Sequence, residues 1–272
     1  MKTIALCIIC KDENEDLKEN IDYHTLLGVD HFIIYDDGSK NPLSEDFKNY
    51  KNVTVNPWSS KDPHRYQQRC YESCVKQYKN DYKWIGFIDT DEFIVIKNDI
   101  MDIKEFLIPY EKYGGLGIQW KCFGSSGHIK RQKSTIKSYI HARPNKEDRH
   151  IKSIVNPRVV IRTNDPHSFR FKEGYFCVNE NEERIIGPFN KPSVTKFSDF
   201  QIKNKPFIIT RNKIQLNHYV TRSEEDFKLK AQRGDVNCRP RTSRFTTKYW
   251  EQFQNGEKDT TILDFIKKIK NG

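Results

Sequence analysis

The sequence predicts a single α/β domain in which helices flank a mixed, mostly parallel sheet. The chain has 272 residues, of which 36% are hydrophobic and 12% aromatic, so it can bury a sizeable core. Residues 1–96 alternate apolar strand patterns with helix patterns, which is typical of a parallel sheet. No stretch rich in Pro, Gly or Ser divides the chain, so we expect residues 1–272 to form one domain.

Residues 1–100 contain four expected strands and two expected helices. The strands are 3–10, 31–37, 53–58 and 84–89, and the helices are 12–28 and 64–78. Gly28 stands where the first helix should end, because glycine readily adopts the left-handed conformation of a helix C-terminus. In folds of this kind ligands bind beyond the carboxyl ends of the parallel strands.

The remainder of the chain is less regular. A short helix is expected at 101–110, strands at 114–124 and 211–220, and helices at 223–234 and 260–269. Ser223 and Gly234 are suited to begin and end the helix between them. The basic segment 124–168 has little periodicity before 153–162, so we expect a surface segment or a mobile loop over a site.

The chain carries an excess of positive charge. It has 47 Lys and Arg against 37 Asp and Glu, a net charge of +10, which favours anionic partners such as nucleic acids, anionic membranes or sugar nucleotides. The basic run 239–244 has no interleaved aromatic residues, so we expect no nucleic-acid partner. We also expect no membrane span and no signal peptide. With an odd count of seven cysteines, this favours a cytoplasmic protein with reduced thiols.

Carboxylates interrupt the apolar stretch WIGFIDTDEFIVI at 84–96. Ionised carboxylates are costly to bury unless water or a cation neutralises them. Asp89 and Asp91 can point into one cleft if the strand continues locally, and Asp36 and Asp37 end another expected strand. A solvated turn is the plain alternative. Acids at two strand ends favour a hard divalent cation, Mn²⁺ or Mg²⁺, whose remaining ligands are water and phosphate.

Four stretches of the sequence resemble GT-A glycosyltransferases, close to the family-2-like and family-92-like enzymes. They are KDENEDLKENIDYHTLLGVDHFIIYDDGS, KWIGFIDTDEF, WKCFGSSGH and LNHYVTRSEEDFKLKAQRGD, in the order found in those families. The resemblance covers most of residues 3–237 and implies a GT-A-like fold. It implies a nucleotide-sugar-binding half at 1–100, an acceptor and catalytic half at 101–237, and a helical extension at 238–272. The implied reaction moves a sugar from a nucleotide-diphosphate sugar, with UDP expected, to a glycan or other hydroxyl acceptor.

The resemblance also implies roles for individual residues. Asp89, Asp91 and His218 would hold Mn²⁺ or Mg²⁺, Asp37 or Asp36 would contact the nucleoside, Arg222 would lie near the diphosphate, and Lys11 and Gln67 would belong to the donor site. The chain departs from the pattern, since it has KDE where family members often have KNE, and Asp-Asp where they often have Asp-Asn. Both aspartates therefore stay candidates for the nucleoside contact. For His218 the alternative is a buried core histidine, and Trp120 either stacks on an acceptor sugar or fills the core.

An inverting transfer needs a base that is separate from the metal ligands. The candidate acids are Asp148, Asp165 and Glu173, and we select Asp165 because it lies on an expected loop beside His167. Two other functions fit the composition. One is a sugar-nucleotide nucleotidyltransferase, although KDENED is not the Gly-rich phosphate loop expected of it. The other is a basic nucleic-acid-binding module, whose binding would depend steeply on salt.

Overall fold

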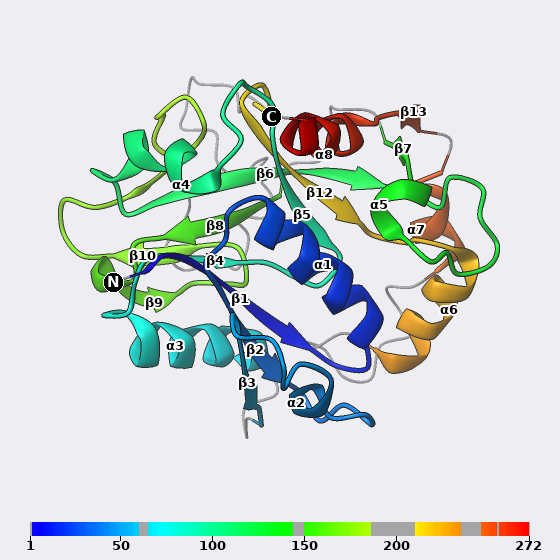
Figure 1. Ribbon diagram of the computed structural model, residues 1–272, viewed down its shortest axis with the longest axis horizontal. Coiled ribbons are helices and arrows are strands. Elements are labelled where there is room, and N and C mark those ends of the chain that lie inside the picture. The colour runs from blue at the N-terminus through cyan, green and yellow to red at the C-terminus, as the bar shows by residue number, and fades with distance from the viewer. Residues whose placement is uncertain are drawn as a thin grey trace.

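The computed structural model describes residues 2–59, 65–143, 150–185, 210–234, 246–254 and 256–271 (Figure 1). The candidate acid Asp148 and the basic run 239–244 lie outside the described residues. Within the described part, no helix is both long and apolar enough to cross a membrane.

The first half of the chain builds a parallel sheet. Its elements are β1 (Lys2–Cys10), α1 (Asn14–Leu26), β2 (His31–Asp36), α2 (Leu43–Asp46), β3 (Val53–Pro57), α3 (Tyr66–Tyr78) and β4 (Tyr82–Phe87). Strand β1 pairs in parallel with both β2 and β4, and β2 pairs in parallel with β3. The predicted α/β class and the alternation of strands and helices are therefore confirmed.

The apolar stretch at 84–96 is two strands and not one. After β4 the chain turns, and the backbone N–H of Glu92 donates to the carbonyl of Asp89 at 3.1 Å. Strand β5 (Glu92–Ile96) then pairs antiparallel with β12 (Ile214–Tyr219). Asp89 and Asp91 thus lie in a tight turn, so the alternation of a continuing strand is not what places them.

The second half of the chain extends the sheet with mixed pairing. After α4 (Ile103–Phe106) and the 3₁₀ turn η2 (Ile108–Tyr110) comes β6 (Gly115–Phe123), which pairs in parallel with β12 and antiparallel with β8 (Ile151–Val155). Strand β8 also pairs antiparallel with β4, so it lies inside the sheet between β4 and β6.

The interior position of β8 corrects the expectation for the segment 124–168. That stretch contains α5 (Thr135–Ser138), β7 (His141–Ala142), β8, the 3₁₀ turn η3 (Pro157–Val159) and β9 (Val160–Thr163). All five residues of β8 are buried, including Lys152 and Ser153. Because a strand paired on both sides cannot move as a loop, the segment as a whole is not a lid over a site. The polar residues Lys152 and Ser153 interrupt the apolar pattern of β8, so the whole strand could not be recognised from its periodicity.

Both faces of the N-terminal sheet are covered. On one face Leu6 and Ile8 belong to an apolar cluster that includes residues of α1 and α8 (Thr261–Asn271). On the other face Ala5 and Cys7 pack in a second cluster with residues of α3. The helix predicted at 260–269 is confirmed as α8, and it packs on the domain through the buried Ile262 and Phe265.

The remaining elements lie around the second half of the sheet. They are β10 (Phe169–Phe171), β11 (Cys177–Val178), α6 (Glu224–Arg233), α7 (Thr247–Glu251) and β13 (Glu257–Lys258). Helix α6 begins at the predicted cap Ser223, whose hydroxyl accepts from the backbone of Asp226, and ends at Gly234 with φ of 83°. Figure 1 shows α6 beside the carboxyl end of β1, and this places its last turn next to the strand-end acids.

Candidate active site

A cavity of about 280 Å³ opens at the carboxyl ends of β1, β2 and β4. Its charged and polar lining residues are Lys11, Glu13, Asp37, Gln67, Asp89, Thr90, Asp91, Lys152, His167, His218, Lys230 and Arg233. Cys10 and Trp120 complete much of the remaining wall, with Tyr249 at one side. The position agrees with the general rule that ligands bind beyond the carboxyl ends of parallel strands.

The two aspartates after β2 have different positions. Asp36 closes the turn, because its carboxylate accepts from the backbone N–H groups of Ser39 at 2.9 Å and Leu43 at 3.1 Å. Asp37 lines the cavity, and the Tyr66 hydroxyl donates to it at 2.5 Å. Of the two candidates for the nucleoside contact, Asp37 is therefore the one that a ligand in the cavity can reach.

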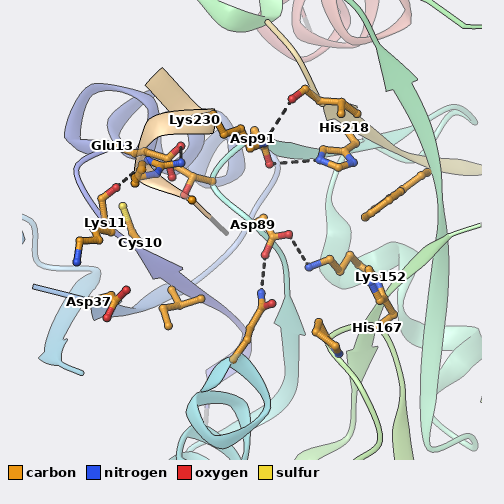
Figure 2. Close-up of a pocket in the computed structure, with 18 of the residues that line it drawn as sticks. Cys10, Lys11, Glu13, Asp37, Asp89, Asp91, Lys152, His167, His218 and Lys230 are labelled. Atoms are coloured by element: carbon orange, nitrogen blue, oxygen red, sulfur yellow. Dashed lines mark hydrogen bonds and ion pairs between the residues drawn. The ribbon is translucent and has the colours of Figure 1, made fainter. Parts of the chain in front are cut away.

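Asp89 is held by a hydrogen bond and an ion pair from two different elements. The Gln67 side chain of α3 donates to its Oδ1 at 2.8 Å, and Lys152 Nζ lies 2.9 Å from its Oδ2 (Figure 2). Behind it Glu92 is fully buried, accepts from the Asp89 backbone N–H at 2.8 Å and lies 3.6 Å from Lys152. Burial raises the pKa of Glu92 to about 8, although Lys152 opposes the rise. Burial alone would lower the pKa of Lys152, but the attraction of Asp89 and Glu92 raises it above its usual value.

Asp91 meets a different pair of groups. Lys230 Nζ of α6 lies 2.7 Å from its Oδ2, and His218 Nε2 lies 3.6 Å from its Oδ1 (Figure 2). Burial would raise the pKa of Asp91, yet Lys230 and then His218 hold it well below its usual range, so the carboxylate is ionised at neutral pH. The Tyr219 backbone N–H donates to the Asp91 carbonyl at 2.9 Å, which ties the turn to the end of β12.

Arg222 was expected near the diphosphate, but it does not line the cavity. Its guanidinium is buried behind the wall, 3.1 Å from Glu13 and 2.6 Å from Asp16. The cations of this region that do face the cavity are Lys230 and Arg233 of α6. Arg233 also holds Glu13 at 2.9 Å. Neither cation was predicted from the sequence, although their i, i+3 spacing in a helix next to the late histidine was a usable signal.

Asp165, selected as the base, is fully buried and does not line the cavity. Its Oδ1 accepts from the backbone N–H groups of His167 at 2.7 Å and Ser168 at 2.9 Å, and the Ser168 hydroxyl donates to its Oδ2 at 3.0 Å. Burial raises the pKa of Asp165 to about 6. These bonds shape the loop before β10, and the side chain that this loop presents to the cavity is His167. Glu173, the other described candidate, is exposed outside the cavity.

The three expected metal ligands are not gathered around one point. Among the residues that the structure describes, no three His, Cys, Asp or Glu side chains are grouped closely enough to hold a metal ion. Asp91 and His218 do approach each other at 3.6 Å, and two ligands of one octahedral ion stand about 3 Å apart. The pair therefore suits a cation that takes its other ligands from phosphate and water. Asp89 instead turns towards Lys152 and Gln67.

Trp120 links His218 to the opposite wall of the cavity. Its ring centroid lies 4.2 Å from that of His218, 4.6 Å from that of His150 and 5.3 Å from that of His167. Only 7% of Trp120 is exposed, so its edge reaches the cavity while most of the ring packs. The burial of Trp120 agrees with the core reading from the sequence, and stacking on an acceptor sugar stays a prediction.

Known proteins with similar sequences belong to a family that the sequence motifs resemble. The sequence profile of glycosyltransferase family 92 matches residues 2–232. A family 92 protein of Oryza sativa subsp. japonica is 29% identical over 195 residues, which is 68% of this chain and 32% of the relative. A family 92 protein of Ricinus communis is 27% identical over 200 residues, 67% of this chain and 34% of the relative. The chain thus spans about a third of the length of these curated relatives.

Solved structures resemble the chain only weakly. A 4-diphosphocytidyl-2C-methyl-D-erythritol synthase from Anaerococcus prevotii DSM 20548 has a TM-score of 0.34 at 11% identity, covering 58% of this chain and 71% of that one. A glucosyl-3-phosphoglycerate synthase from Mycobacterium tuberculosis, solved with Mn²⁺ and UDP, has a TM-score of 0.30 at 15% identity, covering 44% of each chain. The assignment therefore comes from the sequence profile and the curated relatives, and it confirms the predicted resemblance. The chain belongs to glycosyltransferase family 92.

Proposed function

We propose that the cavity binds a nucleotide-diphosphate sugar, UDP-linked, and transfers its sugar to a hydroxyl group of a glycan or other acceptor. The observation that carries the proposal is the pairing of strand-end acids with cations around one cavity. Asp91 faces Lys230 and His218, and Asp89 faces Lys152. A mixed wall of this kind can hold a diphosphate and still position hydroxyl groups, because cations bind the phosphates while carboxylates accept from hydroxyls.

The wall divides into three parts that suit three parts of the donor. Asp37 and Lys11 follow β2 and β1 and are suited to the nucleoside. Lys230 and Arg233 offer positive charge to the diphosphate. Lys152 lies on the other side of Asp89 and is suited to contact the sugar of the donor. In Figure 2 Lys152 lies away from Lys11 and Asp37.

The chemistry requires stabilisation of charge on the leaving diphosphate. Lys230 and Arg233 supply part of it, because fixed cations at the site of developing charge lower the barrier. Mn²⁺ or Mg²⁺ would be held by Asp91 and His218. Asp89 would lie nearby and would accept hydrogen bonds from hydroxyl groups of the donor or from water. When bound, the ion adds positive charge against the diphosphate. The transfer is proposed to invert the anomeric centre, so the acceptor hydroxyl attacks from the face opposite the leaving group.

The test is a donor-hydrolysis screen with the purified chain. UDP- and GDP-linked sugars are incubated with Mn²⁺, and release of nucleoside diphosphate is measured for wild type and for Asp91→Asn. We expect release from at least one donor and its loss in the variant. Release of pyrophosphate from a nucleoside triphosphate and a sugar phosphate would instead identify a nucleotidyltransferase. No turnover in either assay, with UDP binding absent by calorimetry, would refute the proposal.

A further inference from the structure

His167 occupies the cavity wall in a defined tautomer. It lies on the loop between β9 and β10, and its Nδ1 is 2.8 Å from the carbonyl oxygen of Ile151. A carbonyl oxygen can only accept, so Nδ1 carries the proton and donates it. The other ring nitrogen, Nε2, consequently bears a lone pair.

That lone pair is available to a ligand. His167 is partly exposed and lines the cavity, and within the described part of the chain its Nε2 has no hydrogen-bond partner. The described carboxylates of the same wall are engaged. Glu13 pairs with Arg222 and Arg233, Asp37 accepts from Tyr66, Asp89 pairs with Lys152, and Asp91 pairs with Lys230. The oxygens of these carboxylates already accept hydrogen bonds or face cations, whereas Nε2 of His167 is open to the cavity.

The surroundings fix the ring in place. Asp165 accepts from the His167 backbone N–H at 2.7 Å, and the Ser153 hydroxyl donates to the His167 carbonyl at 2.6 Å. The Trp120 ring meets the imidazole edge to face at 5.3 Å. Ile151 and Ser153 both belong to β8, so an interior strand supports the loop. A group held this way needs little reorganisation when it reacts.

The charges near His167 keep the imidazole neutral. Burial, followed by Lys152 and His150, holds the pKa of His167 well below its usual value, and His218 of β12 acts in the same direction. The ring therefore keeps its lone pair at neutral pH. A bound donor adds negative charge to the cavity, which makes the imidazole more basic than in the empty site.

We propose that His167 is the catalytic base of the transfer, with Nε2 accepting the proton of the acceptor hydroxyl. This inference rests on the proposed function. In the step, the acceptor oxygen forms a bond to the anomeric carbon, the bond from that carbon to the diphosphate breaks, and its electron pair leaves with the nucleoside diphosphate. The hydroxyl proton passes to Nε2, giving an imidazolium that then loses it to solvent. Asp165 serves this step as a positioning residue, because it holds the loop and does not reach the cavity.

The experiment compares His167→Ala with His128→Ala, a histidine that lies outside the cavity. UDP- and GDP-hexoses are the donors, water is the acceptor, and UDP binding is measured separately by calorimetry. Loss of a positioned base costs about 10²-fold or more in turnover. We expect that loss in His167→Ala with UDP affinity unchanged, and no loss in His128→Ala. Free imidazole should restore turnover in His167→Ala, whereas pyrazole, which has the same size but little basicity, should not.

Each other outcome overturns the inference. Equal turnover in His167→Ala and wild type would remove His167 from the chemistry. Equal rescue by imidazole and pyrazole would show that the ring only fills space beside Trp120. A fall in UDP affinity that accounts for the whole loss would make His167 a binding residue. If wild type neither binds UDP nor turns over a donor, the proposed function fails and the inference fails with it. If wild type turns over a donor and His167→Ala does so equally, only the inference fails.

Discussion

Apart from Lys11, the two halves of the domain contribute opposite charges to the site. The N-terminal half supplies carboxylates, with Asp37 after β2 and Asp89 and Asp91 after β4. The second half supplies cations, with Lys152 on β8 and Lys230 on α6. The acids follow β2 and β4, which lie on either side of β1 in the parallel sheet, whereas Lys230 lies 139 positions from the Asp91 that it contacts.

The contrast shows how the cavity depends on the whole domain. Carboxylates gathered at one edge of a sheet repel one another and are costly to desolvate. When β8 enters the sheet and α6 packs beside β1, their lysines neutralise these acids at 2.9 Å and 2.7 Å. The acid half therefore positions the groups, and the cation half makes their burial possible. Five predictions test this division, and they are ordered by expected effect.

The largest effect is expected from Asp91→Ala, because Asp91 joins the two halves. The change removes the partner of Lys230 and His218 and the proposed link to the diphosphate. Charge stabilisation of several kcal/mol corresponds to about a thousand-fold loss of turnover. Asp89→Ala should lose less, since its partner Lys152 keeps Glu92 as a neighbour. Circular dichroism should show that both variants fold. Equal losses in the two variants would contradict different roles for the two acids.

Lys152→Met tests the cation half through stability. Lys152 is 1% exposed, and its loss leaves the Asp89 carboxylate at 2.9 Å without a cation. Breaking a buried ion pair from one side costs about 3 kcal/mol of unfolding free energy. Adding Asp89→Asn should recover part of that loss, because the unpaired charge is then absent. Urea unfolding of the single and double variants measures it. If the double variant is no more stable than Lys152→Met, the pairing with Asp89 is not the cause.

The same contrast explains what the sequence could predict. The strand-end acids were found because apolar periodicity and its polar interruption are local, and the capping residues Ser223 and Gly234 were found for the same reason. Lys152 could not be recognised as buried, because its partners come from the turn after β4 and a lysine in a basic segment normally reads as solvated. Arg222 matched a motif, but only packing shows that Glu13 and Asp16 hold it behind the wall.

The acid half also contains a buried histidine, His24, which should make the stability of the protein depend on pH. His24 of α1 is buried, its Nε2 accepts from the Ile94 backbone N–H at 3.1 Å, and Nδ1 donates to the Asn20 carbonyl at 2.9 Å. Burial lowers the pKa of His24 to about 3, against about 6.5 in an unfolded chain. Between these values the unfolded state binds the extra proton, so stability is complete above pH 6.5 and is lost as the pH falls.

Through His24, acidification from pH 7 to pH 5 should therefore lower the free energy of unfolding by about 2 kcal/mol. Urea unfolding at the two pH values measures the loss, and His24→Gln should show a correspondingly smaller one. A pH dependence that is identical in wild type and His24→Gln would exclude His24 as its source. The Lys152→Met effect, in contrast, should already be present at pH 7.

Lys230→Met tests whether the cation half contacts the donor and not only Asp91. We expect about a tenfold to thirtyfold weaker affinity for UDP, because one charge-assisted contact with a phosphate is lost. Lys228→Met is the matched control, since Lys228 lies on the same helix with 67% of its side chain exposed and pairs with Glu224. Calorimetric titration of UDP into both variants separates them. Equal affinities would confine Lys230 to neutralising Asp91.

His218→Phe is expected to have the smallest effect, and it decides whether the two halves share a metal ion. His218 comes from β12 in the second half, and its Nε2 faces Asp91 of the first half at 3.6 Å. Its Nδ1 is buried without a hydrogen-bond partner in the described part of the chain, which is unusual for a histidine that serves only the core. Phenylalanine keeps a ring against Trp120, whose centroid is 4.2 Å away, but it cannot bind a metal.

We therefore expect His218→Phe to weaken Mn²⁺ affinity about tenfold, or ~1.4 kcal/mol, with little change in melting temperature. The measurement is a calorimetric titration of Mn²⁺ in the presence of UDP, with a thermal melt of the same samples. A core histidine would give the reverse, a lower melting temperature with Mn²⁺ affinity unchanged. In that case Asp91 would be the protein ligand left to hold a cation, and the histidine would belong to the aromatic packing around Trp120. The acid half would then bind the metal without help from the second half of the domain.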